Sequence, residues 1–115
     1  MLGDNYIEAK KDAIKIFTSL GMLHQIDHLP SQLSGGEQQR VSVIRAIVRK
    51  PKILFADEPT ASLDTERSQD LMSVLLQLHQ KGQTIIMVTH EEEFAKMAQR
   101  LIFVRDGQIV KDTIL

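Results

Sequence analysis

The 115-residue sequence has no cysteine, which excludes disulfide bonds and thiolate chemistry. It also has no long hydrophobic run, because its longest apolar stretches, such as 84–89, are far too short to span a bilayer. Acidic residues interrupt the N-terminal region at Asp4, Glu8 and Asp12, unlike a signal peptide. We therefore expect any link to a membrane to come through a partner.

An excess of charge of one sign is lacking too. The 14 Lys and Arg residues nearly balance the 15 Asp and Glu residues, and the net charge is −1. Surfaces that bind nucleic acid carry a basic excess, so we expect no nucleic acid partner. With 43% hydrophobic and 25% charged residues, the composition is that of an ordinary globular domain, and the length suits one small domain.

Hydrophobic spacing and helix caps predict three main helices, over residues 4–21, 34–50 and 64–82. Each range begins with serine or aspartate, which cap helix N-termini, and two of them end in glycine. The remaining range, 34–50, ends just before Pro51, as helices often do.

Two short apolar segments, 52–56 and 84–89, predict buried strands. Residues 91–99 predict a short helix with glutamates in its first turn, where the helix dipole favours them. Asp106-Gly107 between apolar stretches predicts a closing hairpin. This order of elements predicts an α/β domain with parallel strands.

Two carboxylates, Asp57 and Glu58, follow the first predicted strand directly. Ligands bind at the carboxyl edge of open α/β sheets, where one carboxylate can hold a metal and its neighbour can orient a water toward a phosphate. Adjacent carboxylates are also common in solvated loops. His90 follows the second strand, which could pair beside the first, whereas a lone histidine is usually structural.

The stretch LSGGEQQR matches a capping box, with Ser34 and Glu37 at the start of a helix. Free amides at a helix N-terminus bind anions, and a nucleotide phosphate would suit Ser34, Gly35 and Gly36. A well-capped helix without a ligand is the alternative interpretation.

Four motifs follow one another along the chain: LSGGEQQR, ILFADEPT, ASLD and VTHE. In this order and at this spacing they closely resemble the ATP-binding-cassette (ABC) transporter ATPases, from Leu29 to Asp112. They are similar to the family's signature, Walker B strand, D-loop and histidine switch, respectively. Among subfamilies the chain most resembles the macrolide-export and lipoprotein-release ATPases. The resemblance implies a partial P-loop NTPase-like fold, with parallel core strands, flanking helices and a C-terminal hairpin.

The resemblance also implies a role for each matching residue. Asp57 would help to hold Mg²⁺, Glu58 would be the general base that polarises the attacking water, and His90 would contact the γ-phosphate of ATP. Asp64 would couple two sites across a dimer. The signature residues would bind the γ-phosphate of a nucleotide held by the opposite subunit, and they are Ser34, Gly35, Gly36 and Gln38. The implied partners are a second nucleotide-binding domain and a transmembrane permease subunit, at the cytoplasmic face of the cell membrane.

The phosphate-binding loop G-x-x-x-x-G-K-[ST] does not occur in the sequence, because none of its six glycines precedes a lysine. The family has this loop before the signature, so the chain resembles one partial domain, with a helical signature part at 1–50 and the Walker B strand onward at 51–115. Phosphoryl transfer depends on positioning the phosphates. We therefore expect the chain alone to bind Mg-ATP weakly or not at all and not to hydrolyse it.

In the family the strand bearing the phosphate-binding loop lies between the His90 strand and the C-terminal strand. Without it, we expect 53–56 to pair in parallel with 85–88. The hairpin is then expected to pack onto the exposed sheet edge or to pair with another chain in a homodimer.

A second interpretation is a non-catalytic binding or regulatory module that docks on a full-length nucleotide-binding domain. Such a module would bind a partner bearing the phosphate loop only when ATP is present. A third interpretation is a relative that serves DNA repair or translation, but the lack of basic clusters argues against it.

Overall fold

The computed structural model describes residues 7–8, 10–12, 14–15, 18 and 35–115. The named elements follow in the order α2 (Gly35–Val48), β1 (Ile53–Asp57), α3 (Thr65–Gln80), β2 (Thr84–Val88), α4 (Glu92–Ala95), β3 (Arg100–Arg105) and β4 (Gln108–Ile114). The described residues before α2 are helical, in agreement with the first predicted helix, whose two ends lie outside the described residues. Among the described helices, none is long and apolar enough to cross a membrane.

Helix α2 forms because its apolar residues recur on one side. Val41, Ile44 and Ile47 are buried at intervals of three residues. The helix ends before Pro51 as predicted, and Lys50 leaves it with a φ of 52° while its amide donates to the carbonyl of Ile47. The predicted capping box begins at Ser34, which lies outside the described residues.

Helix α3 has the caps that the sequence predicts. The Asp64 carboxylate accepts a hydrogen bond of 2.8 Å from the amide of Arg67, and Gly82 closes the helix with a φ of 102°. Its buried side provides most of the core, which it shares with Ile47 of α2 and Leu54 of β1. The buried residues of α3 are Ser68, Leu71, Met72, Val74, Leu75 and Leu78.

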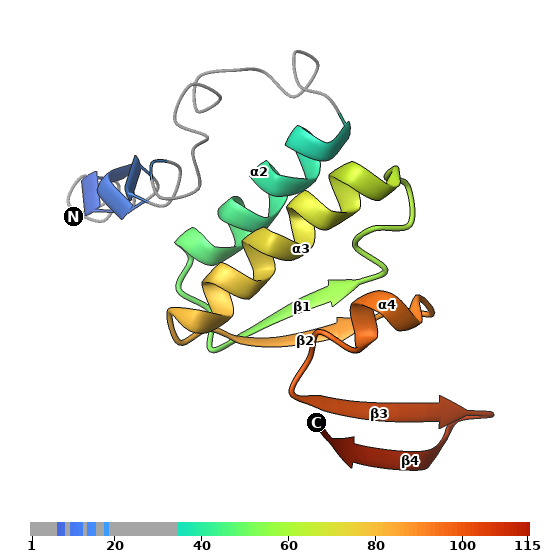
Figure 1. Ribbon diagram of the computed structural model, residues 1–115. Helices are drawn as coiled ribbons and strands as arrows, with labels where there is room; N and C mark the ends of the chain where they lie inside the picture. Colours follow the sequence, from blue (N-terminus) through green and yellow to red (C-terminus); the bar gives the residue numbers. More distant parts are fainter. Residues whose placement is uncertain (1–6, 9, 13, 16–17, 19–34) are drawn as a thin grey trace.

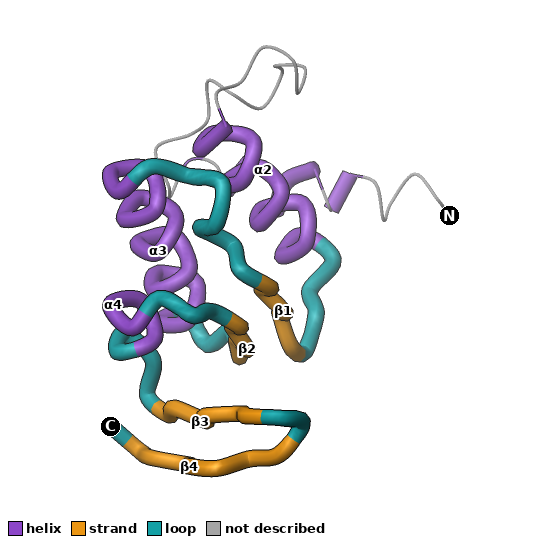
Figure 2. Tube along the Cα trace, turned by 90° about the vertical axis from the view of Figure 1, so that its right-hand side faces the viewer, coloured by secondary structure: helices purple, strands orange, loops and turns teal. Residues whose placement is uncertain are grey.

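Strands β1 and β2 pair in parallel, with Ile53 opposite Thr84 and Asp57 opposite Val88. This confirms the predicted pairing. Helices α2 and α3 lie side by side above this sheet (Figure 1), and the perpendicular view agrees (Figure 2). Alternate strand residues, including Leu54 and Met87, face the core beneath the helices.

The prediction that both strands are buried is wrong for the face of the sheet that points away from the helices. Strand side chains alternate between faces, and no described element covers the face away from the helices. Four apolar residues are exposed on it, and we call them the open sheet face: Ile53, Phe55, Ile86 and Val88. Phe55 is 71% exposed, which is exceptional for an aromatic residue in a strand.

The predicted hairpin forms around Asp106-Gly107, whose φ angles of 50° and 75° suit a tight two-residue turn. An ion pair braces it, in which the Arg100 guanidinium donates two hydrogen bonds, of 2.9 and 2.6 Å, to the Asp112 carboxylate. Strands β3 and β4 form a sheet of their own. The expectation that the hairpin packs onto the edge of the first sheet within the chain is therefore wrong, and both views draw it apart from β1 and β2 (Figures 1 and 2).

Helix α4 is shorter than the predicted 91–99. It covers only Glu92–Ala95, and Phe94 is its buried residue. One apolar anchor holds one turn, after which the chain bends toward β3.

Candidate active site

The carboxyl ends of β1 and β2 lie on the same side of the molecule as the first turns of α2 and α3 (Figure 1). Parallel pairing produces this arrangement, because both strands then end at one edge of the sheet. The loops that leave this edge carry Glu58 and His90, which are 32 residues apart in the chain. Ligands of open α/β sheets bind at such an edge.

Glu58 and His90 are in direct contact. The Nδ1 atom of His90 lies 2.9 Å from the Oε1 atom of Glu58. Glu58 has a φ of 45°, which turns the chain out of β1, and its amide donates a 2.8 Å hydrogen bond to the carbonyl of Val88. The parallel pairing of the two strands, which the sequence predicts, brings His90 beside Glu58.

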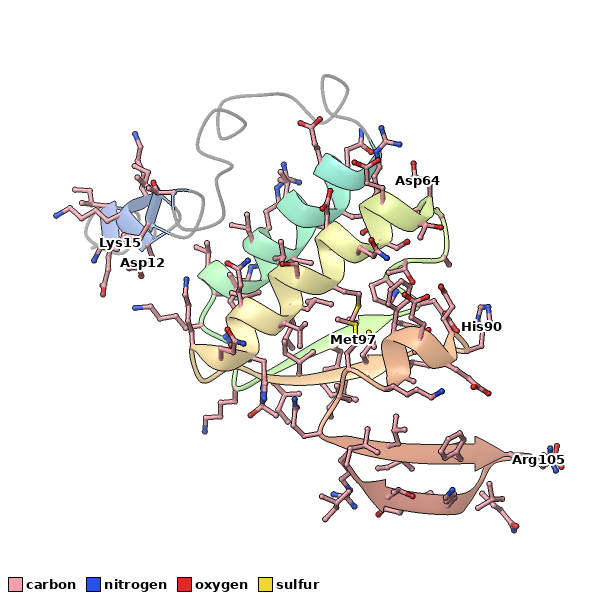
Figure 3. The ribbon with its side chains drawn as sticks, viewed as in Figure 1. Asp12, Lys15, Asp64, His90, Met97 and Arg105 are labelled. Atoms are coloured by element: carbon pink, nitrogen blue, oxygen red, sulfur yellow. The ribbon has the colours of Figure 1, made fainter. Side chains whose placement is uncertain are left out.

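The electrostatics of the pair favour a charged imidazole. The hydrogen bond to Glu58 and the charge of that carboxylate raise the pKa of His90 above 6.5, and Glu91 adds to the effect. A protonated imidazole donates from both nitrogens, so Nε2 remains as a donor while Nδ1 serves Glu58. Figure 3 shows the labelled His90 projecting outward from the loop after β2.

The second carboxylate oxygen of Glu58, Oε2, is buried and has no hydrogen-bond partner among the described residues. Burying such an acceptor unpaired is unfavourable, and a ligand or water that donates to it, or a cation, would relieve the cost. Asp57 is exposed at the end of β1, directly before Glu58.

These two carboxylates fit a magnesium ion only in part. Mg²⁺ in phosphate sites is held by one or two carboxylates together with the substrate's phosphates and water. Among the described residues no group of three or more His, Cys, Asp or Glu is placed to hold a metal by itself. The two carboxylates could therefore supply part of the coordination of a metal ion but could not complete it by themselves.

A second bond links the same two loops, and the sequence reasoning missed it. The Thr60 hydroxyl donates a 2.8 Å hydrogen bond to Oε1 of Glu91. Thr60 is only 2% exposed, although it lies in a loop between β1 and α3. The position of the two residues could have indicated this bond, because both follow the ends of paired strands, as Glu58 and His90 do.

Asp64 and the described signature residues lie at the starts of helices α3 and α2, and not in the two loops that carry Glu58 and His90. Asp64 lies at the start of α3, where its carboxylate binds the amide and the guanidinium of Arg67, the latter at 2.7 Å. Figure 3 shows Asp64 on the same side of the molecule as His90. Gly35 and Gly36 form the first turn of α2, followed by Gln38, whereas Ser34 lies outside the described residues.

A family profile described as "ABC transporter" matches residues 2–61 of the chain. The macrolide export ATP-binding/permease protein MacB of Chlorobium luteolum is 50% identical over 103 residues, which are 90% of this chain and 16% of that protein. An uncharacterized ABC transporter ATP-binding protein of Methanocaldococcus jannaschii is also 50% identical, over 89% of this chain and 46% of that protein. The chain thus spans less than half the length of either relative.

Solved structures agree with the sequence matches. The ADP conformation of MJ1267, an ATP-binding cassette of an ABC transporter, has a TM-score of 0.85 at 29% identity, over 93% of this chain and 42% of that one. A dimeric structure of MJ0796, a bacterial ABC transporter cassette, has a TM-score of 0.72 at 34% identity, over 90% of this chain and 46% of that one.

Proposed function

Because the chain belongs to the ABC transporter ATPase family, we propose that it supplies the water-activating half of an ATP site that drives transport. Members of the family bind ATP with Mg²⁺. The observation that carries the proposal is the 2.9 Å contact between Glu58 and His90 at the carboxyl edge of the sheet. It joins a potential base to a cationic donor where this fold binds ligands.

Each residue of the pair has a task that suits its surroundings. Glu58 is the general base, because its Oε2 has no partner in the part of the chain that the structure describes and can accept a proton from the attacking water. His90 is held through Nδ1 and uses Nε2 to donate to a terminal phosphate oxygen. Asp57 would hold Mg²⁺, which supplies charge neutralisation of the phosphates when it is bound.

The first turn of α2 serves a second nucleotide. The N-terminus of a helix favours a phosphate through its dipole and its first amides. We propose that Ser34, Gly35, Gly36 and Gln38 bind the γ-phosphate of ATP held by a second nucleotide-binding domain, and that Asp64 lies between the two sites. The partition into a signature part at 1–50 and a Walker B part at 51–115 follows from these roles.

The proposed assembly is a homodimer that works with a transmembrane permease subunit at the cytoplasmic face of the membrane. The named relatives support these partners in two ways: MacB combines ATP-binding and permease functions in its name, and the MJ0796 cassette is dimeric. For the chain by itself, the open sheet face supports association with a second copy, because such apolar surface is rarely left exposed. A monomeric mass by light scattering at high concentration would count against it.

Calorimetry tests how the site is divided between this chain and the rest of a cassette. Mg-ATP is titrated into the folded 115-residue chain at about 100 µM, where dissociation constants approaching the millimolar range still register. The sequence contains no G-x-x-x-x-G-K-[ST] loop, so we expect no saturable heat. Saturable binding would mean that the α2 terminus or the Asp57–Glu58 edge holds nucleotide unaided, and would favour the docking-module interpretation.

A further inference from the structure

The described bonds include three that join the loop after β1 to the end of β2 and the loop that follows it. The amide of Glu58 donates to the Val88 carbonyl at 2.8 Å, Glu58 meets His90 at 2.9 Å, and the Thr60 hydroxyl donates to Glu91 at 2.8 Å. Along both loops the Glu58–His90 contact therefore lies between a backbone bond on one side and the Thr60–Glu91 bond on the other.

The middle contact is the least protected of the three. The His90 side chain is 78% exposed, and that of Glu58 is 32% exposed. Exposed ion pairs hold their geometry poorly, because water and side-chain entropy compete with them. The Thr60–Glu91 bond differs, since the Thr60 hydroxyl is buried and its loss would leave a polar group without a partner.

The Glu91 side chain makes this long-range bond and no local one to its own helix. It occupies the N-cap position of α4, where shorter side chains such as those of aspartate and serine accept from the helix amides. Its side chain makes no such capping bond and extends instead to Thr60, 31 residues away. The amide of Glu91 is satisfied separately by the Thr89 hydroxyl at 3.0 Å.

We propose that the Thr60–Glu91 hydrogen bond is a clamp between the two loops that fixes His90 against Glu58, which makes Thr60 and Glu91 positioning residues of the site. The inference rests on the proposed function only for the task of the Glu58–His90 pair. The clamp itself is a property of the folded chain, and it is testable without nucleotide.

The test is an NMR titration of the His90 imidazole in the full chain, with the signal assigned by a His90→Gln variant. Contact with Glu58 raises the pKa of His90, so this pKa reports how well the pair is held. The wild type sets the upper reference and Glu58→Gln the lower one. Thr60→Val, which keeps the shape of the side chain but removes its hydroxyl, is expected to shift the pKa most of the way to the lower reference. Thr60→Ser is expected to restore it.

A matched pair at Glu91 separates the clamp from the charge. Glu91→Gln and Glu91→Ala both remove the negative charge, but only alanine removes the acceptor for Thr60. We expect the alanine variant to lower the pKa of His90 further than the glutamine variant does. This comparison also stands if Thr60→Val fails to fold.

Two results would overturn the clamp: a folded Thr60→Val variant with the wild-type His90 pKa, or equal shifts in the two Glu91 variants. Either would leave the proposed function intact, since that function rests on the Glu58–His90 contact and not on the Thr60–Glu91 bond. Conversely, a chain that failed to bind ATP would still give the same His90 titration, because that titration is made without nucleotide.

Discussion

Replacing Phe55 with serine tests whether the open sheet face drives self-association. A phenylalanine buries about 150–250 Å² in a core, and at 71% exposure Phe55 leaves roughly 140 Å² for a partner to cover. At about 25 cal/mol per Å² this is worth about 3.5 kcal/mol per protomer, an upper bound because association also orders side chains. We therefore expect Phe55→Ser to weaken self-association by about 100-fold, or roughly 2.7 kcal/mol, which lies below that bound.

The assay is sedimentation velocity over a dilution series of the chain and the variant. Phe103→Ser is the matched control, because Phe103 is an exposed aromatic of the hairpin and stacks under Lys111 at 5.7 Å. If copies exchange hairpins instead, the control weakens association and Phe55→Ser does not. A wild-type chain that stays monomeric at the highest concentration would refute the argument altogether.

Three further predictions concern stability. Asp64→Ala removes the α3 cap and the Arg67 contact, and should lower the free energy of unfolding by about 1 kcal/mol in urea denaturation. Leu71→Ala should cost about 2–5 kcal/mol by the same measurement, because Leu71 is fully buried, and a loss below 1 kcal/mol would mean that this site is poorly packed. The pKa of His90 is higher in the folded than in the unfolded chain, so the stabilisation that the protonated imidazole provides is complete below pH 6.5 and is lost as the pH rises through the folded pKa. The free energy of unfolding, measured between about pH 5 and 8, should therefore fall with rising pH in the wild type, and this fall should be absent in Glu58→Gln.

The sequence predicted the elements with strong local signals. The two ends of α3 were predictable at Asp64 and Gly82, because a capping carboxylate and a glycine at positive φ each depend on a single residue. Asp106-Gly107 fixed the hairpin for the same reason. Parallel pairing of 53–56 with 85–88 was predicted from the family resemblance and confirmed.

The sequence could not show which elements pack against each other. An apolar strand indicates that a face favours burial but not what covers it, so the exposure of Phe55 was not foreseen. The hairpin was predicted as an element, yet its position depends on edges elsewhere in the sheet. Helix α4 was predicted too long, because the run of glutamates marks only where a helix begins.

In the candidate site, one contact was predictable from the sequence and another was not. The Glu58–His90 contact was foreseeable, because paired parallel strands bring the residues that follow them to one edge. The Thr60–Glu91 bond follows the same geometry one step further along each loop, but it requires a loop hydroxyl to be buried, which periodicity does not reveal.

The most direct test of the central claim is the ATPase rate of a chimera. The chain replaces the matching segment of the M. jannaschii ATP-binding protein, to which it is 50% identical over 102 residues. The account predicts that the chimera hydrolyses ATP and that Glu58→Gln lowers its kcat by at least about 100-fold, the usual contribution of a general base. A folded chimera that binds ATP but keeps its rate after Glu58→Gln would contradict the claim that this chain carries the catalytic base.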